Sequence, residues 1–401
     1  MAKWVGRSSA LLLIMVAGSV FLLSQCEQFG AVPTGPDLER MTKSQNYNTD
    51  QKIFVNESPG VIEEMFAHSG FWANPRKNLA NNFLFNPNTP TPKVPLPEVR
   101  GSLPDDLRDT LDTVKFTWLG HATVLASING KTILFDPVFS ESASPVSWAV
   151  KRYQPPAIGL GELPPIDFIV ISHDHYDHLD MKAIKFFKES NTQFLVPLGI
   201  ASHLEYWGIN RDQVTEFDWW QTRDIAGISF TCTPAQHFSG RTATIAMQKT
   251  LWSSWALRTE ATSVYFSGDS GYADHFKEIG DRLGPFDLTF IDAGQYNERW
   301  RQVHNLPPEV IDAFNDLRGD ILVPIGWGMF TLALHDWYEP PVEISSRAFK
   351  IGATVVIPSL GNGWTSIRSF RTKSGGNHLS NKCGHQPFKN VCFQAMRIAT
   401  N

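Results

Sequence analysis

From about Val114 onward the chain alternates short apolar runs with polar residues, and most of these runs have the length of β-strands. The runs at 114–128 and 131–137 are separated by Asn-Gly, which is typical of a tight hairpin turn. Other apolar runs end where polar residues begin, as buried strands often do. These runs are DFIVISH, TQFLVPLG, GISFTCTPAQH, SVYFSGDSG, DLTFIDAG, DILVPIGW and ATVVIPSLG.

Helix-like periodicity occurs between several of these strands. The segments 181–190, 201–209 and 307–317 place apolar residues on one face of a helix. Strands outnumber helices, and polar residues of the types that bind metals or catalyse reactions gather at the strand ends. The pattern therefore predicts an α/β fold with sheets packed inside helices and a site at one edge of the sheets.

The regions outside this pattern divide the chain into four parts. Residues 1–26 form a targeting segment, and residues 27–111 are rich in Pro, Asn and charge, which indicates an extended arm and linker. Residues 112–367, which contain the strand and helix pattern, form the main domain, and residues 368–401 form a polar tail. Aromatic residues in the arm (Phe71, Trp72, Phe83, Phe85) suggest that parts of it pack on the main domain.

The first 26 residues have the features of a secretory signal. Lys3 and Arg7 precede an uncharged apolar stretch that ends at Cys26 in LLSQC. This resembles a bacterial lipobox, whose cysteine is lipidated, although Gln25 stands where a small residue is usual. An uncleaved anchor and a buried N-terminal helix are the alternatives. Either leading interpretation places the domain in the cell envelope, outside the cytoplasm and tethered to a membrane.

Composition narrows the function classes. The 401 residues are 42% hydrophobic, which is enough for a large core, and the net charge of −5 gives no reason to expect nucleic-acid binding. Cys383 and Cys392 are close enough in sequence for a small disulfide, which nothing in the sequence requires. Cys232 lies in an apolar run and is expected to be a buried thiol.

The segment IVISHDHYDHLD, residues 169–180, carries the densest cluster of ligating side chains. His173, His175, Asp177 and His178 form H-x-H-x-D-H directly after a buried run. Imidazole and carboxylate ligands together suit a divalent ion such as zinc. Four ligands in six residues exceed what one ion usually takes from one loop, so two ions sharing distant ligands are expected. A solvated charged loop is the alternative.

The same spacing resembles the signature of the metallo-β-lactamase superfamily, whose fold is a four-layer αβ/βα sandwich of two β-sheets flanked by helices. Further motifs narrow the resemblance to the branch of N-acyl-phosphatidylethanolamine-hydrolysing phospholipase D, over roughly 116–353. These motifs are TWLGHATVL, FDPVFSESASP, FDWWQ, TPAQHFSGRT, LWSSWAL, FSGDSGYADHFKEIG, GPFDLTFI and HNLPPEVIDAF.

The resemblance implies seven ligands for two divalent ions, with one carboxylate bridging them. They are His173, His175 and His237 for the first ion, Asp177, His178 and His335 for the second, and Asp269 for the bridge. His237 and Asp269 both follow apolar β runs, which agrees with ligands projecting from one edge. Zinc is favoured by these ligand types, while manganese or iron would also suit the mixed set.

Several other positions match the family with less defined roles. His304 is expected to contact the substrate or transition state, with a helix-start residue as the alternative. His121 and Asp136 are expected to shape the site by orienting ligands. Tyr176 faces the cleft or packs. Relatives often carry a histidine where this chain has Gly326, which bears on substrate identity.

The resemblance implies a hydrolase in which two cations lower the pKa of a bridging water, and the resulting hydroxide attacks phosphorus. Asp177, Asp269 and His304 are the expected catalytic residues. The expected substrate is a lipid of the N-acyl-phosphatidylethanolamine type. A lactonase or esterase with the same two-metal site, and a non-catalytic envelope lipoprotein, are the alternatives. Related enzymes can dimerise, so a homodimer is left open. Four tryptophans are expected either to line an apolar approach or to pack in the core. They are Trp219, Trp220, Trp252 and Trp255.

Overall fold

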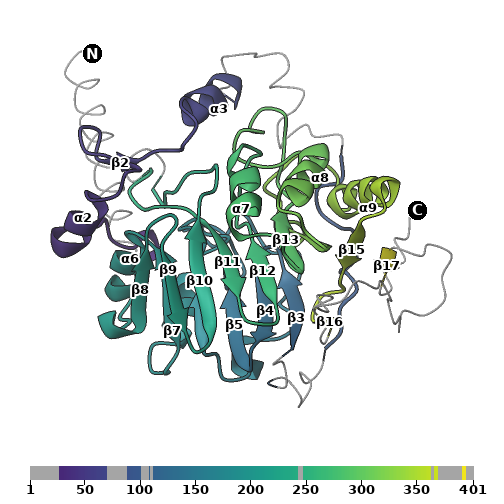
Figure 1. The fold of residues 1–401 in the computed structure, drawn as a ribbon, viewed down its shortest axis with the longest axis horizontal. Coiled ribbons are helices and arrows are strands. Elements are labelled where there is room, and N and C mark those ends of the chain that lie inside the picture. Colours follow the sequence, from purple (N-terminus) through teal and green to yellow (C-terminus); the bar gives the residue numbers. More distant parts are fainter. Residues whose placement is uncertain are drawn as a thin grey trace, which may run out of the picture.

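Two β-sheets lie face to face at the centre of the molecule (Figure 1). The computed structural model describes residues 27–69, 88–100, 108, 112–242, 247–362, 365–368 and 391–393. Over these residues one sheet has seven strands in the order β16-β3-β4-β5-β6-β7-β8. Its strands are β3 (Thr113–Gly120), β4 (Thr123–Ile128), β5 (Lys131–Phe135), β6 (Phe168–Val170), β7 (Gln193–Pro197), β8 (Val214–Phe217) and β16 (Thr365–Arg368).

The other sheet has eight strands in the order β17-β15-β14-β13-β12-β11-β10-β9. Its strands are β9 (Thr222–Ile225), β10 (Ile228–Thr233), β11 (Ser254–Arg258), β12 (Ser263–Phe266), β13 (Leu288–Asp292), β14 (Ile321–Ile325), β15 (Thr354–Ile357) and β17 (Val391–Phe393). In both sheets one part is a meander of antiparallel strands and the other is parallel. Parallel strands need crossover connections, and helices lie in most of them, although the connection from β5 to β6 contains only a short 3-10 turn.

Helices cover the outer face of each sheet. Helices α5 (Met181–Phe186) and α6 (Ile200–Tyr206) pack Ile184 and Leu204 onto the seven-stranded sheet. The other sheet is covered by α7 (His275–Leu283), α8 (Pro307–Asp316) and α9 (Glu339–Ile351), as Figure 1 shows. Short 3-10 turns occur at η2 (Leu160–Glu162) and η3 (Arg211–Gln213). This layering confirms the predicted α/β sandwich of two sheets flanked by helices.

Aromatic side chains fill the space between the sheets. Phe135 of β5 stacks on Phe266 of β12 with ring centroids 4.7 Å apart, and Phe116 of β3 meets Phe290 of β13 edge to face. Such pairs add about 0.5–1.5 kcal/mol beyond the burial of their area. Three of the four tryptophans considered above belong to this core rather than to a surface approach. They are Trp219, Trp252 and Trp255.

The local signals that were strongest in the sequence correspond to observed elements. Asn129 and Gly130 both have positive φ (51° and 70°) between β4 and β5, as a tight hairpin of this type requires. The three segments predicted as helices overlap α5, α6 and α8. Strand β9 and helix α9 had no clear signal, because β9 is largely exposed and polar and α9 begins with two prolines. Cys232 is a buried free thiol, as predicted.

The predicted arm contributes elements of its own. They are η1 (Glu27–Phe29), α2 (Gly35–Met41), β1 (Tyr47–Asn48), β2 (Ile53–Phe54) and α3 (Val61–Ser69). Strand β17 from the predicted tail pairs with β15 at the edge of the larger sheet. The targeting segment and Cys26, the four arm aromatics and Cys383 lie outside the described residues. Within the described ranges, every helix is too short or too polar to span a bilayer.

Candidate metal centre

The histidine and aspartate side chains of interest follow the carboxyl ends of strands at one edge of the two sheets. Strands β3, β5 and β6 run in the same direction in one sheet, and β10, β12, β13 and β14 do so in the other. The loop after β6 carries the H-x-H-x-D-H motif, and the loops after β10 and β12 carry His237 and Asp269. The strand directions therefore bring His173 and Asp269, which are 96 positions apart in the sequence, to the same edge.

A first group consists of three imidazoles and one carboxylate. One donor atom from each of its members lies within 4.8 Å of the others. The members are His173, His175, His237 and Asp269. His175 Nδ1 lies 2.9 Å from His173 Nε2 and 3.2 Å from His237 Nε2. Three nitrogens and one oxygen are the donor set that a tetrahedral Zn²⁺ prefers.

The charge state of these histidines fits a bound cation. Burial lowers the pKa of His173 and His237 well below the usual range, and it lowers the pKa of His175 as well. The three rings are therefore neutral near pH 7, and their facing nitrogens can offer lone pairs to an ion that lies between them. Neutral imidazoles are the form that binds metal ions. Their convergence is stabilised when a cation lies among them, so the residues fit the ion that the motif implies.

A second group lies beside the first. It comprises His121, Asp177 and His178, again with donor atoms within 4.8 Å. His121 Nε2 is 2.8 Å from Asp177 Oδ2, and His178 Nε2 is 3.6 Å from the same oxygen. Burial works against protonation of His178, but the carboxylates of Asp269 and Asp177 raise its pKa well above normal. A positive charge is thus favoured at this position, whether a proton or a metal ion supplies it.

Asp269 stands between the two groups. Its Oδ2 atom lies 3.1 Å from His178 Nε2, 3.8 Å from His237 Nε2 and 4.0 Å from His173 Nε2. Burial disfavours its ionised form, but His178 and His304 hold its pKa well below the usual range. A carboxylate that faces both groups is placed to bridge two ions.

The ring nitrogens on the far side of the ligands are held by hydrogen bonds. His173 Nδ1 lies 2.9 Å from Ser172 Oγ, and His237 Nδ1 donates to the carbonyl of Val303 at 2.9 Å. His178 Nδ1 lies 2.7 Å from Asp136 Oδ2. Such partners fix the ring orientation of metal-binding histidines.

Two residues that were expected to shape the site carry strained backbone. His121 has φ 53° and Asp136 has φ 39°, in a region that non-glycine residues rarely adopt. They follow β3 and β5, where Asp136 accepts from both the backbone N–H and the hydroxyl of Ser172. Strain of this kind, of order 1–3 kcal/mol per residue, concentrates at functional sites. His121 orients Asp177 through Nε2, and its Nδ1 is buried without a hydrogen-bond partner among the described residues.

His335 is not brought into either group of the described residues. Its Nδ1 lies 2.9 Å from the carbonyl of the next residue, Asp336, and its ring stacks on Tyr296 with the ring centroids 4.4 Å apart. It lines a cavity of about 500 Å³ together with Tyr296 and the first residues of α8. The sequence alone did not show that the loop between β14 and α9 turns this ring away.

His304, an expected catalytic residue, pairs with Asp292, which the sequence pattern did not single out, and with Asp269 they form a further cluster of donor atoms within 4.8 Å. His304 Nδ1 lies 2.9 Å from Asp292 Oδ2, and His304 Nε2 lies 3.9 Å from Asp269 Oδ2. Burial alone would lower the pKa of His304, but Asp292 and Asp269 raise it to about 9. Asp292 ends strand β13, so the strand-end rule that found Asp269 would also have found it.

Gly326 lies at the same edge of the sheets. It follows β14 with φ 78°, and a Cβ built there would lie 2.6 Å from Asp292 Oδ1. Any side chain would therefore be strained and would displace the carboxylate that holds His304. The two positions are linked, because Asp292 occupies the space that a larger residue at 326 would need.

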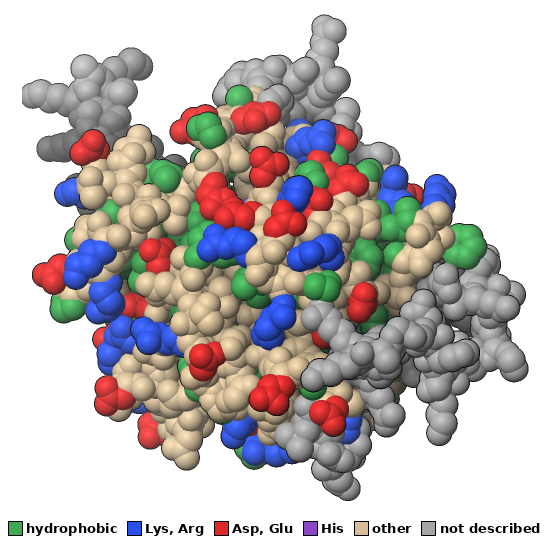
Figure 2. Space-filling model, in the orientation of Figure 1, with side chains coloured by type: hydrophobic (Ala, Val, Ile, Leu, Met, Phe, Trp, Pro, Cys, Tyr) green, Lys and Arg blue, Asp and Glu red, His purple; other side chains and the backbone are tan. Residues whose placement is uncertain are grey.

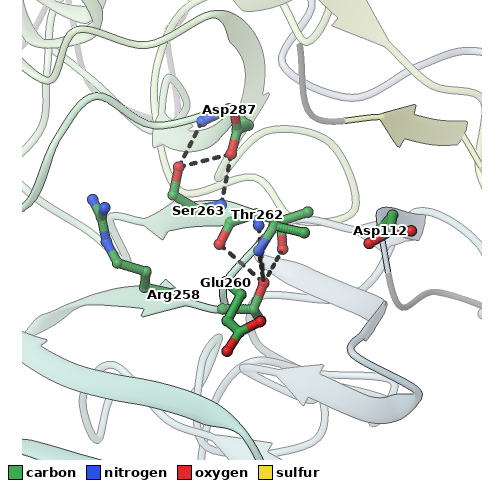
Figure 3. Close-up of a pocket in the computed structure, with 8 residues that line it drawn as sticks. Asp112, Arg258, Glu260, Thr262, Ser263 and Asp287 are labelled. Atoms are coloured by element: carbon green, nitrogen blue, oxygen red, sulfur yellow. Dashed lines mark hydrogen bonds between the residues drawn. The ribbon is translucent and has the colours of Figure 1, made fainter. Parts of the chain in front are cut away.

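Other surface features lie away from this centre. Figure 3 shows a hollow of about 270 Å³ beside the turn that joins β11 to β12. It lies where β12 and β13 begin, at the opposite edge from the histidines, and its Asp287 accepts from Ser263. On the face seen in Figure 2, acidic and basic side chains are interspersed.

The comparisons with known proteins agree with this geometry. The model of the β-lactamase superfamily domain matches residues 131–327. An N-acyl-phosphatidylethanolamine-hydrolyzing phospholipase D of Caenorhabditis elegans is 40% identical over 238 residues, which cover 56% of this chain and 67% of that protein. The chain belongs to the metallo-β-lactamase superfamily. Together with the two His/Asp groups, this membership makes it a metal-dependent hydrolase of the superfamily.

Two further similarities concern an uncharacterized relative and a solved structure. An uncharacterized protein of Mycobacterium tuberculosis is 39% identical over 272 residues, which cover 67% of this chain and 72% of that protein. The crystal structure of an isothiocyanate hydrolase from Delia radicum gut bacteria superposes with a TM-score of 0.51 at 14% identity, and covers 64% of this chain and all of that one. The second similarity concerns the fold alone.

Proposed function

We propose that the chain is a phosphodiesterase of phospholipase D type, which cleaves N-acyl-phosphatidylethanolamine-like lipids. The observation that carries the proposal is the position of Asp269, whose Oδ2 lies within 4.0 Å of a ring nitrogen of His173, His178, His237 and His304. This one carboxylate is therefore close to both candidate ion sites and to His304. The identity to the C. elegans phospholipase D supports the choice of substrate.

When bound, two divalent ions would lower the pKa of water and stabilise negative charge on the phosphoryl oxygens. His173, His175, His237 and Asp269 would hold one ion, and Asp177, His178 and Asp269 would hold the other. The remaining work falls to the protein's own groups. Asp177 is 14% exposed and accepts from His121, so it is oriented to take a hydrogen bond from the attacking water.

His304 is placed to act on the leaving group. Its Nδ1 is engaged by Asp292, which leaves Nε2 directed toward Asp269 and the site. The neighbouring Asp292 carboxylate raises the pKa of His304 and so favours the protonated ring. As water attacks phosphorus and the P–O bond to the leaving alcohol breaks, Nε2–H gives its proton to the departing oxygen. The products are phosphatidic acid and an N-acylethanolamine, and general acids of this kind contribute typically 10²- to 10⁴-fold.

A membrane tether would suit such a substrate. We propose that Cys26, or the apolar segment before it, anchors the chain at the cell envelope. The support is the charge and hydropathy pattern of residues 1–25. A Cys26→Ala variant cannot be lipidated. If this variant still fractionates with membranes, the uncleaved anchor is favoured instead.

Product analysis tests the function. The metal-loaded protein is incubated with N-acyl-phosphatidylethanolamine in detergent, and lipid products are measured by mass spectrometry. Release of phosphatidic acid with N-acylethanolamine is the expected result. Hydrolysis of lactones or simple esters without this product would replace the proposal with a lactonase or esterase that uses the same centre. Bound metal without turnover of any of these substrates would favour a binding protein.

A further inference from the structure

Two parts of the N-terminal arm, residues 28–31 and 56–65, contact residues of the candidate metal centre or residues that support it. We infer that this arm is a working part of the metal centre, and that Asn56 is the residue that positions His237 for metal binding. The inference rests on the metal centre of the proposed function but does not depend on its lipid substrate. Residues 27–69 lie outside the range 131–327 that the superfamily model matches.

Asn56 holds both main-chain polar groups of His237. Its Nδ2 donates to the His237 carbonyl at 2.9 Å, and its Oδ1 accepts from the His237 N–H at 3.1 Å. The side-chain amide thus pairs with one residue of the loop as a neighbouring strand would. Among side chains of this length, only an amide has both a donor and an acceptor in the required positions. Because both ends of His237 are fixed, the direction of its Cβ and ring is fixed as well.

The same arm supports the ring of His237 through a second contact. His237 Nδ1 donates to the Val303 carbonyl, which leaves Nε2 to face His175 and Asp269. Val303 is buried in a small cluster with Val61 and Met65 of helix α3. The helix therefore packs against the residue that selects the ring orientation. Both the backbone and the imidazole of His237 depend on residues between 56 and 65.

The start of the arm reaches the loop that carries the other ligands. Arg241 Nε donates to the carbonyl of Gln28 at 2.8 Å. Its Nη1 donates to the carbonyls of Asp174 and Leu179 at 2.7 and 2.9 Å, and these two residues enclose the segment with His175, Asp177 and His178. The guanidinium also lies over the ring of Tyr176, 4.0 Å from its centroid. One buried cation therefore connects the arm to both ends of the metal-binding loop.

The close fit of this part of the arm shows in its backbone. The N–H of Ala31 donates to His203 Nδ1 at 3.0 Å, and a Cβ built on Gly30 would lie 2.1 Å from the same nitrogen. His203 Nε2 in turn lies 3.2 Å from Asp174 Oδ2. Removal of residues that hold a ligand directly, as Asn56 holds His237, typically changes metal affinity by 10- to 100-fold. The arm therefore preorganises ligands that the rest of the fold supplies.

The test is the rate of metal release from the full chain. Wild type and Asn56→Ala are loaded with Zn²⁺ and mixed with excess chelator, and bound zinc is followed with time. We expect one zinc ion to leave Asn56→Ala on the order of 10-fold faster or more. Asn48→Ala is the matched control, because Asn48 lies in the same arm and accepts from the N–H groups of Asp50 and Gln51, away from the site. It should release zinc at the wild-type rate.

The unfolding temperature of the metal-free proteins separates positioning from general stability. If Asn56 positions His237, Asn56→Ala should release zinc faster than Asn48→Ala even when the two metal-free proteins are compared under conditions in which they are equally stable. Release at the wild-type rate, or equal acceleration in Asn48→Ala, would overturn the inference. If Asn56→Ala does not fold, Asn56→Asp serves instead, since it keeps the acceptor for His237 N–H and loses the donor. Asn56→Asp is also expected to release zinc faster than wild type, and an unchanged rate would equally overturn the inference. No substrate is used, so failure of the phosphodiesterase proposal would leave the result unaffected.

Discussion

Asp269 Oδ2 lies 3.1 Å from His178 Nε2, and the two residues belong to loops of opposite sheets. His178 follows β6 of the seven-stranded sheet, and Asp269 follows β12 of the other sheet. The contact exists only when the two sheets are packed at their native distance. The metal centre is therefore built by the sandwich as a whole rather than by the H-x-H-x-D-H loop alone.

Replacement of His237 should lower the metal content, whereas replacement of His335 should leave it unchanged. His237→Ala removes one of four donors from the first group, so we expect it to lose about one metal ion per chain. His335→Ala should keep the wild-type content, because its ring lies outside both groups. Elemental analysis of the purified variants checks both expectations. Loss of a metal ion from His335→Ala would restore the ligand role that the sequence suggested.

His304→Gln should separate metal binding from turnover. The glutamine cannot act as a general acid, so we expect turnover of a phosphodiester to fall by roughly 10²- to 10⁴-fold. Metal content should stay at the wild-type value, because His304 Nε2 is 3.9 Å from Asp269 and the first group is complete without it. Steady-state kinetics with elemental analysis measures both quantities. A variant that loses metal in proportion to its activity would make His304 a ligand instead.

The strand pattern and strand-end residues were predictable from sequence because both depend on local order. A buried strand followed by polar ligands is visible at His173, His237 and Asp269, and the parallel strands place these ends together. The position of His335 was not predictable, since it depends on a long loop between β14 and α9. The role of Asn56 was equally hidden, because its partner lies 181 residues away. Contacts of that separation require the fold.

His275 should make the folded state less stable in acid. Burial lowers its pKa to about 3, whereas the unfolded chain binds a proton near pH 6.5. Between these values the unfolded state holds more protons, so stability falls as the pH drops below about 6.5. We expect the free energy of unfolding of wild type, relative to His275→Asn, to decrease by about 2 kcal/mol from pH 7.5 to 5.

Urea unfolding of both proteins at the two pH values measures this difference. The comparison with His275→Asn cancels the titration of the other groups, because the variant retains them. A difference between wild type and variant that is constant with pH would show that His275 does not titrate in this way.

The most direct test of the metal centre is the number of metal ions per chain, measured by mass spectrometry on wild type and on Asp269→Ala. Asp269 faces both groups, so its loss should weaken both ions at once, whereas wild type should hold two. Two ions in wild type and fewer than one in Asp269→Ala would support the two-metal hydrolase. Two ions in both proteins, or fewer than one in fully reconstituted wild type, would contradict it.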